Sequence, residues 1–204
     1  MPISEPYRSI EGRKRLETEK VKGSRFIATA IPLDSEQPLK PLIEELRREF
    51  PDAGHHCWAW RAGDAFRYSD DGEPSGSAGR PILQQIDGAG VDRLGIVVTR
   101  IFGGTKLGVG GLMRAYGGAA RELLQTVEIL EVIPKHRLIV TLPYELDGAI
   151  LAEAKGWSQQ PVDSQYAADV THRFDVPIPE VEPFRDALVE RSAGRAQIKV
   201  DAND

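Results

Sequence analysis

The sequence predicts a protein of two small domains that each combine helices with strands, and three observations lead to this prediction. Its length of 204 residues suits one large or two small domains. Segments with helical spacing alternate with β-branched runs along the chain. Beyond a boundary at Pro134 and Lys135, the elements follow the strand-helix-strand-strand-helix-strand order of the ferredoxin-like arrangement. We therefore expect domains at residues 1–134 and 135–204.

The elements of the first domain follow from apolar spacing, β-branched runs and turn residues. A polar segment at 1–20 predicts a loose arm or a short helix. The later elements, in chain order, are a strand at 24–31, a helix at 38–50, a hairpin at 55–61 and 65–68, a helix at 81–86, a strand at 94–102, a helix at 110–127 and an edge strand at 128–133. The strand at 94–102 is almost continuously apolar, which is typical of a central strand.

The second domain is assigned in the same way. Its elements are a strand at 137–143, a helix at 146–155, two strands within 158–176, a helix at 179–192 and a strand at 196–201. Gly194 supplies a stop signal after the second of these helices.

Composition excludes several classes of protein. The hydrophobic fraction of 41% and the charged fraction of 28% are ordinary for a folded globular chain. No apolar run approaches the roughly 18 residues of a membrane span, and the start lacks a signal peptide. The single cysteine, Cys57, excludes an intrachain disulfide framework and a zinc site built from cysteines alone. We expect a soluble, cytoplasmic protein without membrane contact.

The charge is unevenly distributed. A formal net charge of −5 argues against a strongly basic nucleic-acid binder. Residues 55–121 nevertheless hold eight basic and six acidic residues, which makes this window weakly positive within an acidic protein. Such a window points to an anionic partner. Chance variation produces differences of this size as well, and charge alone favours that explanation.

The helix expected at 110–127 has two contrasting faces when each residue advances by 100°. Apolar side chains gather on one face, whereas the other face holds Arg114, Gly117, Gly118 and Arg121. Two guanidinium groups that flank a gap without side chains suit a phosphate backbone, because the planar fork of arginine matches phosphate. The alternative is a solvated face with two tolerated glycines, each costing the helix up to about 1 kcal/mol relative to alanine.

The glycine-rich segment 103–111 does not match a nucleotide-binding motif. Val109 and Gly110 stand where a P-loop has lysine followed by serine or threonine, and Met113 replaces the third glycine of G-x-G-x-x-G. We therefore expect no cofactor. Lys106 and the backbone amides before the helix still suit contact with an anion. A tight connection that needs positive φ angles explains the glycines equally well.

His55-His56-Cys57 has the composition of a metal cluster but not its geometry. On a strand, His55 and Cys57 share one face while His56 lies on the other, so at most two of the three side chains face one site. We interpret Cys57 as a small core residue and expect no metal site. Neighbouring residues on a strand also point apart, which argues against a Cys–His nucleophile pair. No catalytic residue is predicted.

The turn-rich stretch 69–79 carries three acidic residues and two serines of interest, namely Asp70, Asp71, Glu73, Ser75 and Ser77. Together with Arg80, the serines precede a helix whose N-terminus suits an anion. The acidic residues are able to hold a cation or to pair with Arg80, Arg100 or Lys106. A solvated loop is the simplest interpretation, and sequence spacing leaves all of these alternatives open.

Four strings of residues carry a family resemblance, at Lys22–Phe26, His55–Ala59, Asp70–Leu83 and Thr99–Gly108. With them, residues from about 20 to 128 resemble the IMPACT/YigZ family. The remainder resembles, more loosely, the C-terminal domain of bacterial YigZ-type members. Ile101 departs from the family pattern, in which an aromatic residue is usual.

The resemblance implies an α+β fold of two two-layer α/β sandwich domains. The first is expected to be similar to domain IV of the translocase EF-G, and the second to be ferredoxin-like and similar to EF-G domain V. The implied function is non-enzymatic binding of RNA or the ribosome in translation regulation, without established catalytic residues.

Phosphate contacts are expected from five basic residues, namely Arg80, Arg100, Lys106, Arg114 and Arg121. Such binding tolerates sequence, so no DNA sequence specificity is expected. Two alternatives remain open. One is a metal- or anion-dependent enzyme that uses residues 55–57 and 70–73, and the other is a protein-interaction module without nucleic-acid contact.

Overall fold

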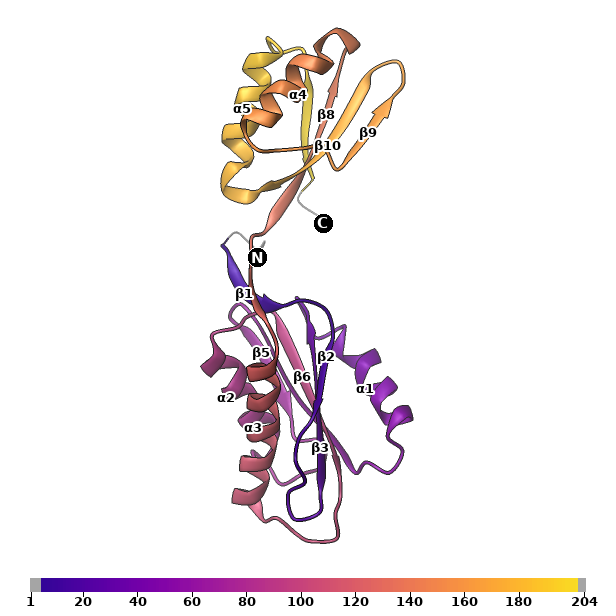
Figure 1. Ribbon diagram of the computed structural model, residues 1–204, viewed down its shortest axis with the longest axis vertical. Helices are drawn as coiled ribbons and strands as arrows, with labels where there is room; N and C mark the ends of the chain where they lie inside the picture. The colour runs from indigo at the N-terminus through magenta and orange to yellow at the C-terminus, as the bar shows by residue number, and fades with distance from the viewer. Residues whose placement is uncertain (1–4, 202–204) are drawn as a thin grey trace. The chain divides into compact units, whose positions relative to one another are not determined.

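The computed structural model describes residues 5–201, which divide into two compact units, 7–132 and 133–201, with residues 5–6 assigned to the latter (Figure 1). Both units combine sheets with helices, so the α+β class and the two-part architecture are confirmed. Within residues 5–201, no helix has both the length and the apolar character needed to cross a membrane.

The first unit is built on a five-stranded antiparallel sheet with the strand order β2-β3-β6-β4-β5. The bounds are β2 (Lys14–Glu17), β3 (Arg25–Pro32), β4 (His55–Ala62), β5 (Ala65–Ser69) and β6 (Leu94–Ile101). β6 is central and buried over most of its length, as its continuous apolar sequence predicts.

Helices cover both faces of this sheet (Figure 1). The helices are α1 (Leu39–Glu49), α2 (Gly79–Ala89) and α3 (Val109–Thr126). The larger core lies between the sheet and α2 and α3, and α1 closes a smaller core on the opposite face around Trp60. The expectation of two layers is therefore wrong for this unit. The reason is that β4 is apolar on both faces, with Ala59 facing α2 and α3 and Trp60 facing α1.

The N-terminal segment forms strands, not the expected loose arm or short helix. β1 (Tyr7–Ile10) pairs antiparallel with β7 (Ile129–Val132). β2 pairs antiparallel with β3 and forms one edge of the five-stranded sheet. Each of these two strands has only four residues, and β2 is mostly polar, so neither gives a clear pattern in the sequence. Residues 1–4 of the expected arm lie outside the described residues.

The second unit has the predicted ferredoxin-like topology. Its four antiparallel strands stand in the order β11-β8-β10-β9, and the alternating burial of β10 shows that helices cover one face. The bounds are β8 (Lys135–Leu142), η1 (Tyr144–Leu146), α4 (Asp147–Gly156), β9 (Asp163–Tyr166), β10 (Val170–Pro177), η2 (Ile178–Glu180), α5 (Val181–Arg191) and β11 (Gln197–Asp201).

Candidate functional site

Helix α3 presents the two faces that its sequence predicts. The face packed in the core consists of Leu112, Ala115, Tyr116, Gly117, Ala119, Ala120, Leu123 and Leu124. Arg114 and Arg121 are exposed on the opposite side. These two arginines are seven positions apart in the sequence, which places them about 10.5 Å apart along the helix axis at 1.5 Å per residue.

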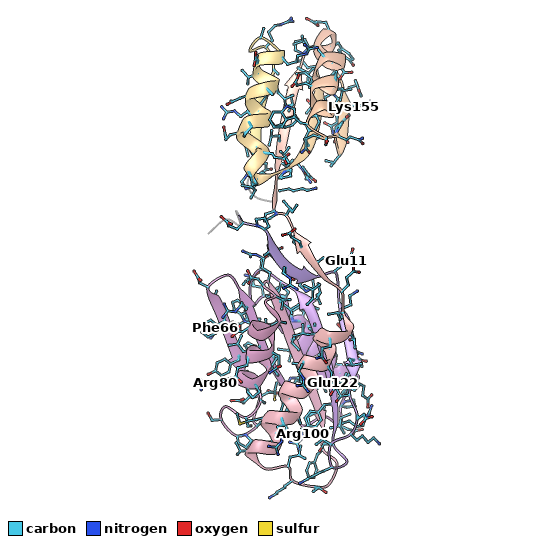
Figure 2. The ribbon with its side chains drawn as sticks, turned by 60° about the vertical axis from the view of Figure 1, so that its left-hand side comes forward. Glu11, Phe66, Arg80, Arg100, Glu122 and Lys155 are labelled. Atoms are coloured by element: carbon cyan, nitrogen blue, oxygen red, sulfur yellow. The ribbon has the colours of Figure 1, made fainter. Side chains whose placement is uncertain are left out.

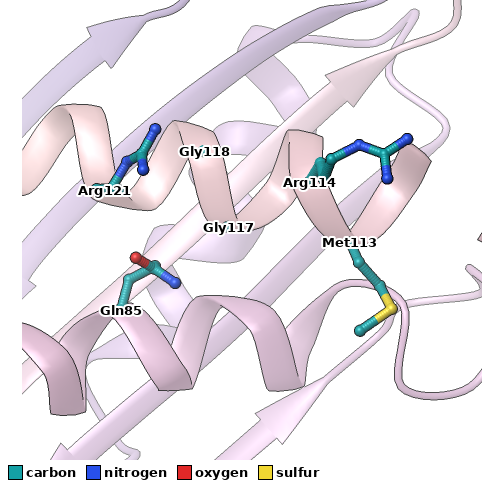
Figure 3. Close-up of a pocket in the computed structure, with 6 residues that line it drawn as sticks. All are labelled: Gln85, Met113, Arg114, Gly117, Gly118 and Arg121. Carbon is teal, nitrogen blue, oxygen red and sulfur yellow. The ribbon is translucent and has the colours of Figure 1, made fainter. Parts of the chain in front are cut away.

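A surface depression of about 340 Å³ lies between the two arginines, at the seam between α3 and α2 (Figure 3). Its lining residues are Gln85, Met113, Arg114, Gly117, Gly118 and Arg121. The close-up shows the two glycines on α3 between the arginines, with Gln85 reaching toward them from α2. The depression is thus the space left by the absent side chains.

Gly117 differs from the expectation because it is buried, not exposed. The reason is that α2 packs against it. A Cβ atom at Gly117 would lie 3.6 Å from Pro81 Cβ and 3.6 Å from Gln85 Nε2, which is ordinary van der Waals contact. At Gly118 a Cβ atom would meet nothing within 4 Å. Helix packing therefore requires glycine at neither position.

The loop before α3 adds a smaller hollow beside the same arginine. Its volume is about 180 Å³, and Lys22, Leu107, Gly111 and Arg114 are among its lining residues. Gly108 precedes the first residue of α3 with a φ angle of 71°, which only glycine adopts easily. Arg114 therefore borders two adjoining hollows.

The cations of the first unit differ in pairing between the two sides of the sheet. Four arginines on the α1 side each bind a carboxylate, in the pairs Arg13–Glu45, Arg15–Glu49, Arg47–Asp71 and Arg67–Glu36. Over residues 7–132, eight exposed cations have side chains without an ion pair or hydrogen bond, namely Arg8, Lys20, Lys22, Lys40, Arg80, Lys106, Arg114 and Arg121. Four of them, Arg80, Lys106, Arg114 and Arg121, lie on α2, on α3 and in the loop before α3, whereas Lys40 lies on α1. Among the described residues, Arg80, Arg114 and Arg121 of α2 and α3 therefore have no carboxylate partner, unlike the four paired arginines on the α1 side.

Asp70 occupies the N-terminus of α2. Its carboxylate accepts hydrogen bonds from the backbone N–H groups of Gly76, Ala78 and Gly79 at 2.8, 2.9 and 2.8 Å. The external anion that the sequence suggested at this terminus is therefore replaced by an internal carboxylate. Ser77 is buried and donates to the Pro74 carbonyl, whereas Ser75 remains exposed.

Gly79 permits this arrangement. A Cβ atom on Gly79 would lie only 2.7 Å from the Ser69 carbonyl oxygen, so a larger residue there would push the start of α2 away from the end of β5. Arg80 follows directly and is exposed.

Glu73 and Arg100 form a buried pair. The Glu73 carboxylate accepts from the Arg100 guanidinium at 2.6 Å and from the Tyr116 hydroxyl at 2.7 Å. The Arg100 guanidinium also lies 5.8 Å from the Phe26 ring centroid and 5.6 Å from that of Phe102. Pairing between the acidic stretch and Arg100 was one of the open alternatives. The structure shows it, and it places Arg100 in the interior, apart from the exposed cations.

Asp71 is engaged as well. Its carboxylate accepts from the His56 backbone N–H at 2.6 Å and from Arg47 at 2.7 Å. Across residues 5–201, no group of three or more His, Cys, Asp or Glu side chains is arranged to hold a metal ion.

The two histidines and the cysteine alternate along β4 as predicted. Cys57 is buried beneath α3 and donates its thiol to the Asp70 carbonyl at 3.0 Å, while His56 contacts the Thr99 hydroxyl at 3.0 Å on the other face. Burial raises the pKa of the Cys57 thiol to about 12, so the nucleophilic thiolate is scarce at neutral pH. Burial also lowers the pKa of His56, with the Arg47 charge as a second cause.

Three side chains of the second unit, Ser164, His172 and Asp147, form a hydrogen-bonded network that the sequence did not predict. His172 is fully buried, and its Nε2 and Nδ1 atoms each lie 2.7 Å from an oxygen, of Asp147 and of Ser164 respectively. Because a carboxylate only accepts, Nε2 carries the proton in the bond to Asp147. One signal was available: His172 stands at an inward position of β10, between Val170 and Phe174. Its partners are distant in sequence and gave no signal.

Comparison with known proteins identifies the family. Residues 22–124 match the Impact N-terminal domain, and residues 149–195 match a domain of unknown function, DUF1949. The chain is 37% identical over 188 residues to IMPACT family member YigZ of Escherichia coli (strain K12), covering 88% of this chain and 91% of that protein. This chain belongs to the IMPACT family. The α3 depression and the 70–79 loop both lie within the Impact N-terminal domain.

Other IMPACT family members extend the similarity. The chain is 31% identical over 189 residues to an IMPACT family member of Haemophilus influenzae, covering 89% of this chain and 91% of that protein. A solved structure described as a crystal structure of an hypothetical protein shares 33% identity with a TM-score of 0.70, over 99% of this chain and 100% of that one. The fold of this IMPACT family member is therefore shared by a solved structure along its whole length.

Proposed function

We propose that this IMPACT family member is a non-enzymatic protein that binds RNA or the ribosome in translation regulation. The surface proposed for this contact is the α2 and α3 side of the first unit. The observation that carries the proposal is the difference in charge pairing: four arginines on the α1 side bind carboxylates, whereas Arg114 and Arg121 bind none among the described residues.

The shape of the surface supports a phosphate backbone as the partner. Arg114 and Arg121 stand at the two ends of the depression, with no side chain between them on α3 to hold a partner's backbone away. Arginine binds phosphate through two parallel N–H donors, and such contacts fix position without reading base sequence. The proposed contact set is Arg80, Lys106, Arg114 and Arg121. Arg100 is left out because Glu73 already binds it in the interior.

The enzyme alternative has less support. It needs the acidic residues of the 70–73 segment to face a substrate or a metal, but their carboxylates bind backbone N–H groups and arginines of the same unit. The protein-interaction alternative is separated from the proposal by experiment.

The experiment measures RNA binding by filter retention, and ribosome binding by pelleting, over a series of salt concentrations. Wild type is expected to bind and to weaken as salt rises, because neutralised phosphates release counterions. Arg114→Gln/Arg121→Gln removes two phosphate contacts. The negative slope of log K against the logarithm of the salt concentration should therefore become shallower by roughly 1.4 to 1.8.

The matched control is Lys40→Gln/Arg48→Gln, which removes two exposed positive charges from α1 on the opposite face. It should bind like wild type. Equal weakening of both double variants would assign the effect to net charge and not to this surface. A wild type that binds neither RNA nor ribosomes at low salt would leave the protein-interaction module as the better interpretation.

A further inference from the structure

The edge of the five-stranded sheet carries two exposed aromatic rings. Phe66 and Tyr68 lie on the edge strand β5 and are 49% and 43% exposed. Residues two apart on a strand point to the same face, at a separation of about 6.8 Å. Tyr68 pairs with Ala59, whose side chain belongs to the core beneath α2 and α3. Both rings therefore stand on the side of the sheet that carries Arg80, Arg114 and Arg121.

An unpaired cation adjoins these rings. The contact of Gly79 with the Ser69 backbone brings the first turn of α2 against the end of β5, and Arg80 follows Gly79. Two helical turns later, Asp87 binds Arg61 of β4, which shows that this side of α2 faces the β4–β5 hairpin. Figure 2 labels Phe66 and Arg80 on the same flank of the first unit. Aromatic rings and positive charge thus share one surface.

The charge at the other end of β5 is balanced. The Arg61 guanidinium lies 5.6 Å from the Phe66 ring centroid and is itself paired with Asp87 at 2.7 Å. Phosphate attraction is therefore strongest at the Tyr68 end, beside Arg80. α2 packs against both α3 and β4, so the edge and the α3 depression lie on the same side of the sheet.

We infer that the RNA is bound as a single strand whose bases stack on Phe66 and Tyr68 while Arg80 binds its phosphate backbone. This inference rests on the proposed function and names its substrate class. The separation of about 6.8 Å between the rings is about twice the 3.4 Å rise between stacked nucleotides of one strand. Two neighbouring bases that each contact one ring are therefore unstacked from each other. Only unpaired bases offer their faces, because in a duplex those faces are covered by the next pair. Each stacked base strengthens binding by roughly 5- to 150-fold.

The experiment compares two labelled probes by fluorescence anisotropy at one salt concentration. One is an oligoadenylate of about 12 nucleotides, within the length range that such surfaces bind, and the other is an RNA duplex of the same length. Wild type should bind the single strand more tightly. Phe66→Ala/Tyr68→Ala should weaken single-strand binding at least 10-fold and leave duplex binding unchanged. Tyr68→Phe keeps the ring and should bind like wild type, while Phe66→Leu/Tyr68→Leu keeps apolar bulk and should bind like the alanine variant.

Three results separate this inference from the proposed function. If the Phe66→Ala/Tyr68→Ala variant binds oligoadenylate like wild type while Arg114→Gln/Arg121→Gln weakens it, stacking is wrong and RNA binding stands. If wild type binds neither probe, the inference is wrong, and if it also does not pellet with ribosomes, the proposed function itself fails. If light scattering shows a wild-type dimer that Phe66→Ala/Tyr68→Ala converts to a monomer without changing RNA binding, the edge belongs to a second copy of the chain. Each variant is expected to fold, because both rings are already exposed in wild type. Circular dichroism melting verifies this.

Discussion

The Arg100 guanidinium donates a hydrogen bond of 2.6 Å to the Glu73 carboxylate, and their side chains are only 8% and 4% exposed. The pair joins the central strand β6 to the loop before α2, and the Tyr116 hydroxyl ties the same carboxylate to α3. Three elements of the first unit thus meet at one buried carboxylate.

Arg100→Met should lower the free energy of unfolding by about 3 to 5 kcal/mol, because it leaves the Glu73 carboxylate buried without its charged partner. Urea unfolding measures the change. Arg100→Met/Glu73→Gln should recover part of the loss, since the second change removes the unpaired charge. Wild-type stability in the single variant would show that the pair is not buried in solution.

Gly118→Ala should raise the free energy of unfolding by up to about 1 kcal/mol, because alanine favours the helix and its Cβ meets nothing within 4 Å. Gly118→Leu should instead fill the depression and weaken RNA binding while the protein stays folded. Gly148→Leu is the matched control, a helical glycine of α4 with the same open surroundings. Its RNA binding should equal that of wild type, and unchanged binding in Gly118→Leu would remove the depression from the contact surface.

Cys57 should resist alkylation in the folded protein at pH 8, because burial raises the pKa of its thiol to about 12. Iodoacetamide followed by mass measurement should detect one modification only after urea is added. Rapid modification of the folded protein would mean that the strand β4 opens or that the thiol has a lower pKa.

His56 should make the protein less stable as the pH falls below 6.5, the ordinary pKa of a histidine side chain. Burial first, and the Arg47 charge second, lower the pKa of His56 in the folded state. Below pH 6.5 the unfolded chain therefore binds the proton that the folded chain does not, which favours unfolding. The stability of wild type relative to His56→Gln should decline between pH 7 and pH 5, as measured by urea unfolding. A constant difference over that range would contradict the lowered pKa.

The faces of α3 were predictable because helical periodicity is a local property. Counting 100° per residue separates Leu123 from Arg121 without knowledge of any other element. The same holds for the alternation of His56 and Cys57 along β4. The β2 strand was not predictable in this way, because Lys14-Arg15-Leu16-Glu17 becomes a strand through its pairing with β3.

The partners of charged residues were the part that the sequence left open. Nothing local distinguishes Arg100, which binds a carboxylate 27 positions away, from Arg114, which has none among residues 5–201. Asp70 likewise looks like a solvated turn residue, yet it binds three backbone N–H groups up to nine positions along the chain. Such pairings depend on which elements the fold brings together.

The pairing of β1 with β7 fixes when the first unit is completed during synthesis. Tyr7 stands opposite Val132 and Ile10 opposite Ile129, so partners about 120 residues apart must both have left the ribosome. At 5–20 residues per second, the first strand waits about 6 to 24 s for its partner. A nascent chain that stops before residue 129 contains all five strands of the main sheet but leaves the buried Ser9 and Ile10 of β1 without β7. The pairing of β1 with β7 therefore completes the first unit only after β7 has left the ribosome, and β7 leads directly into the second unit.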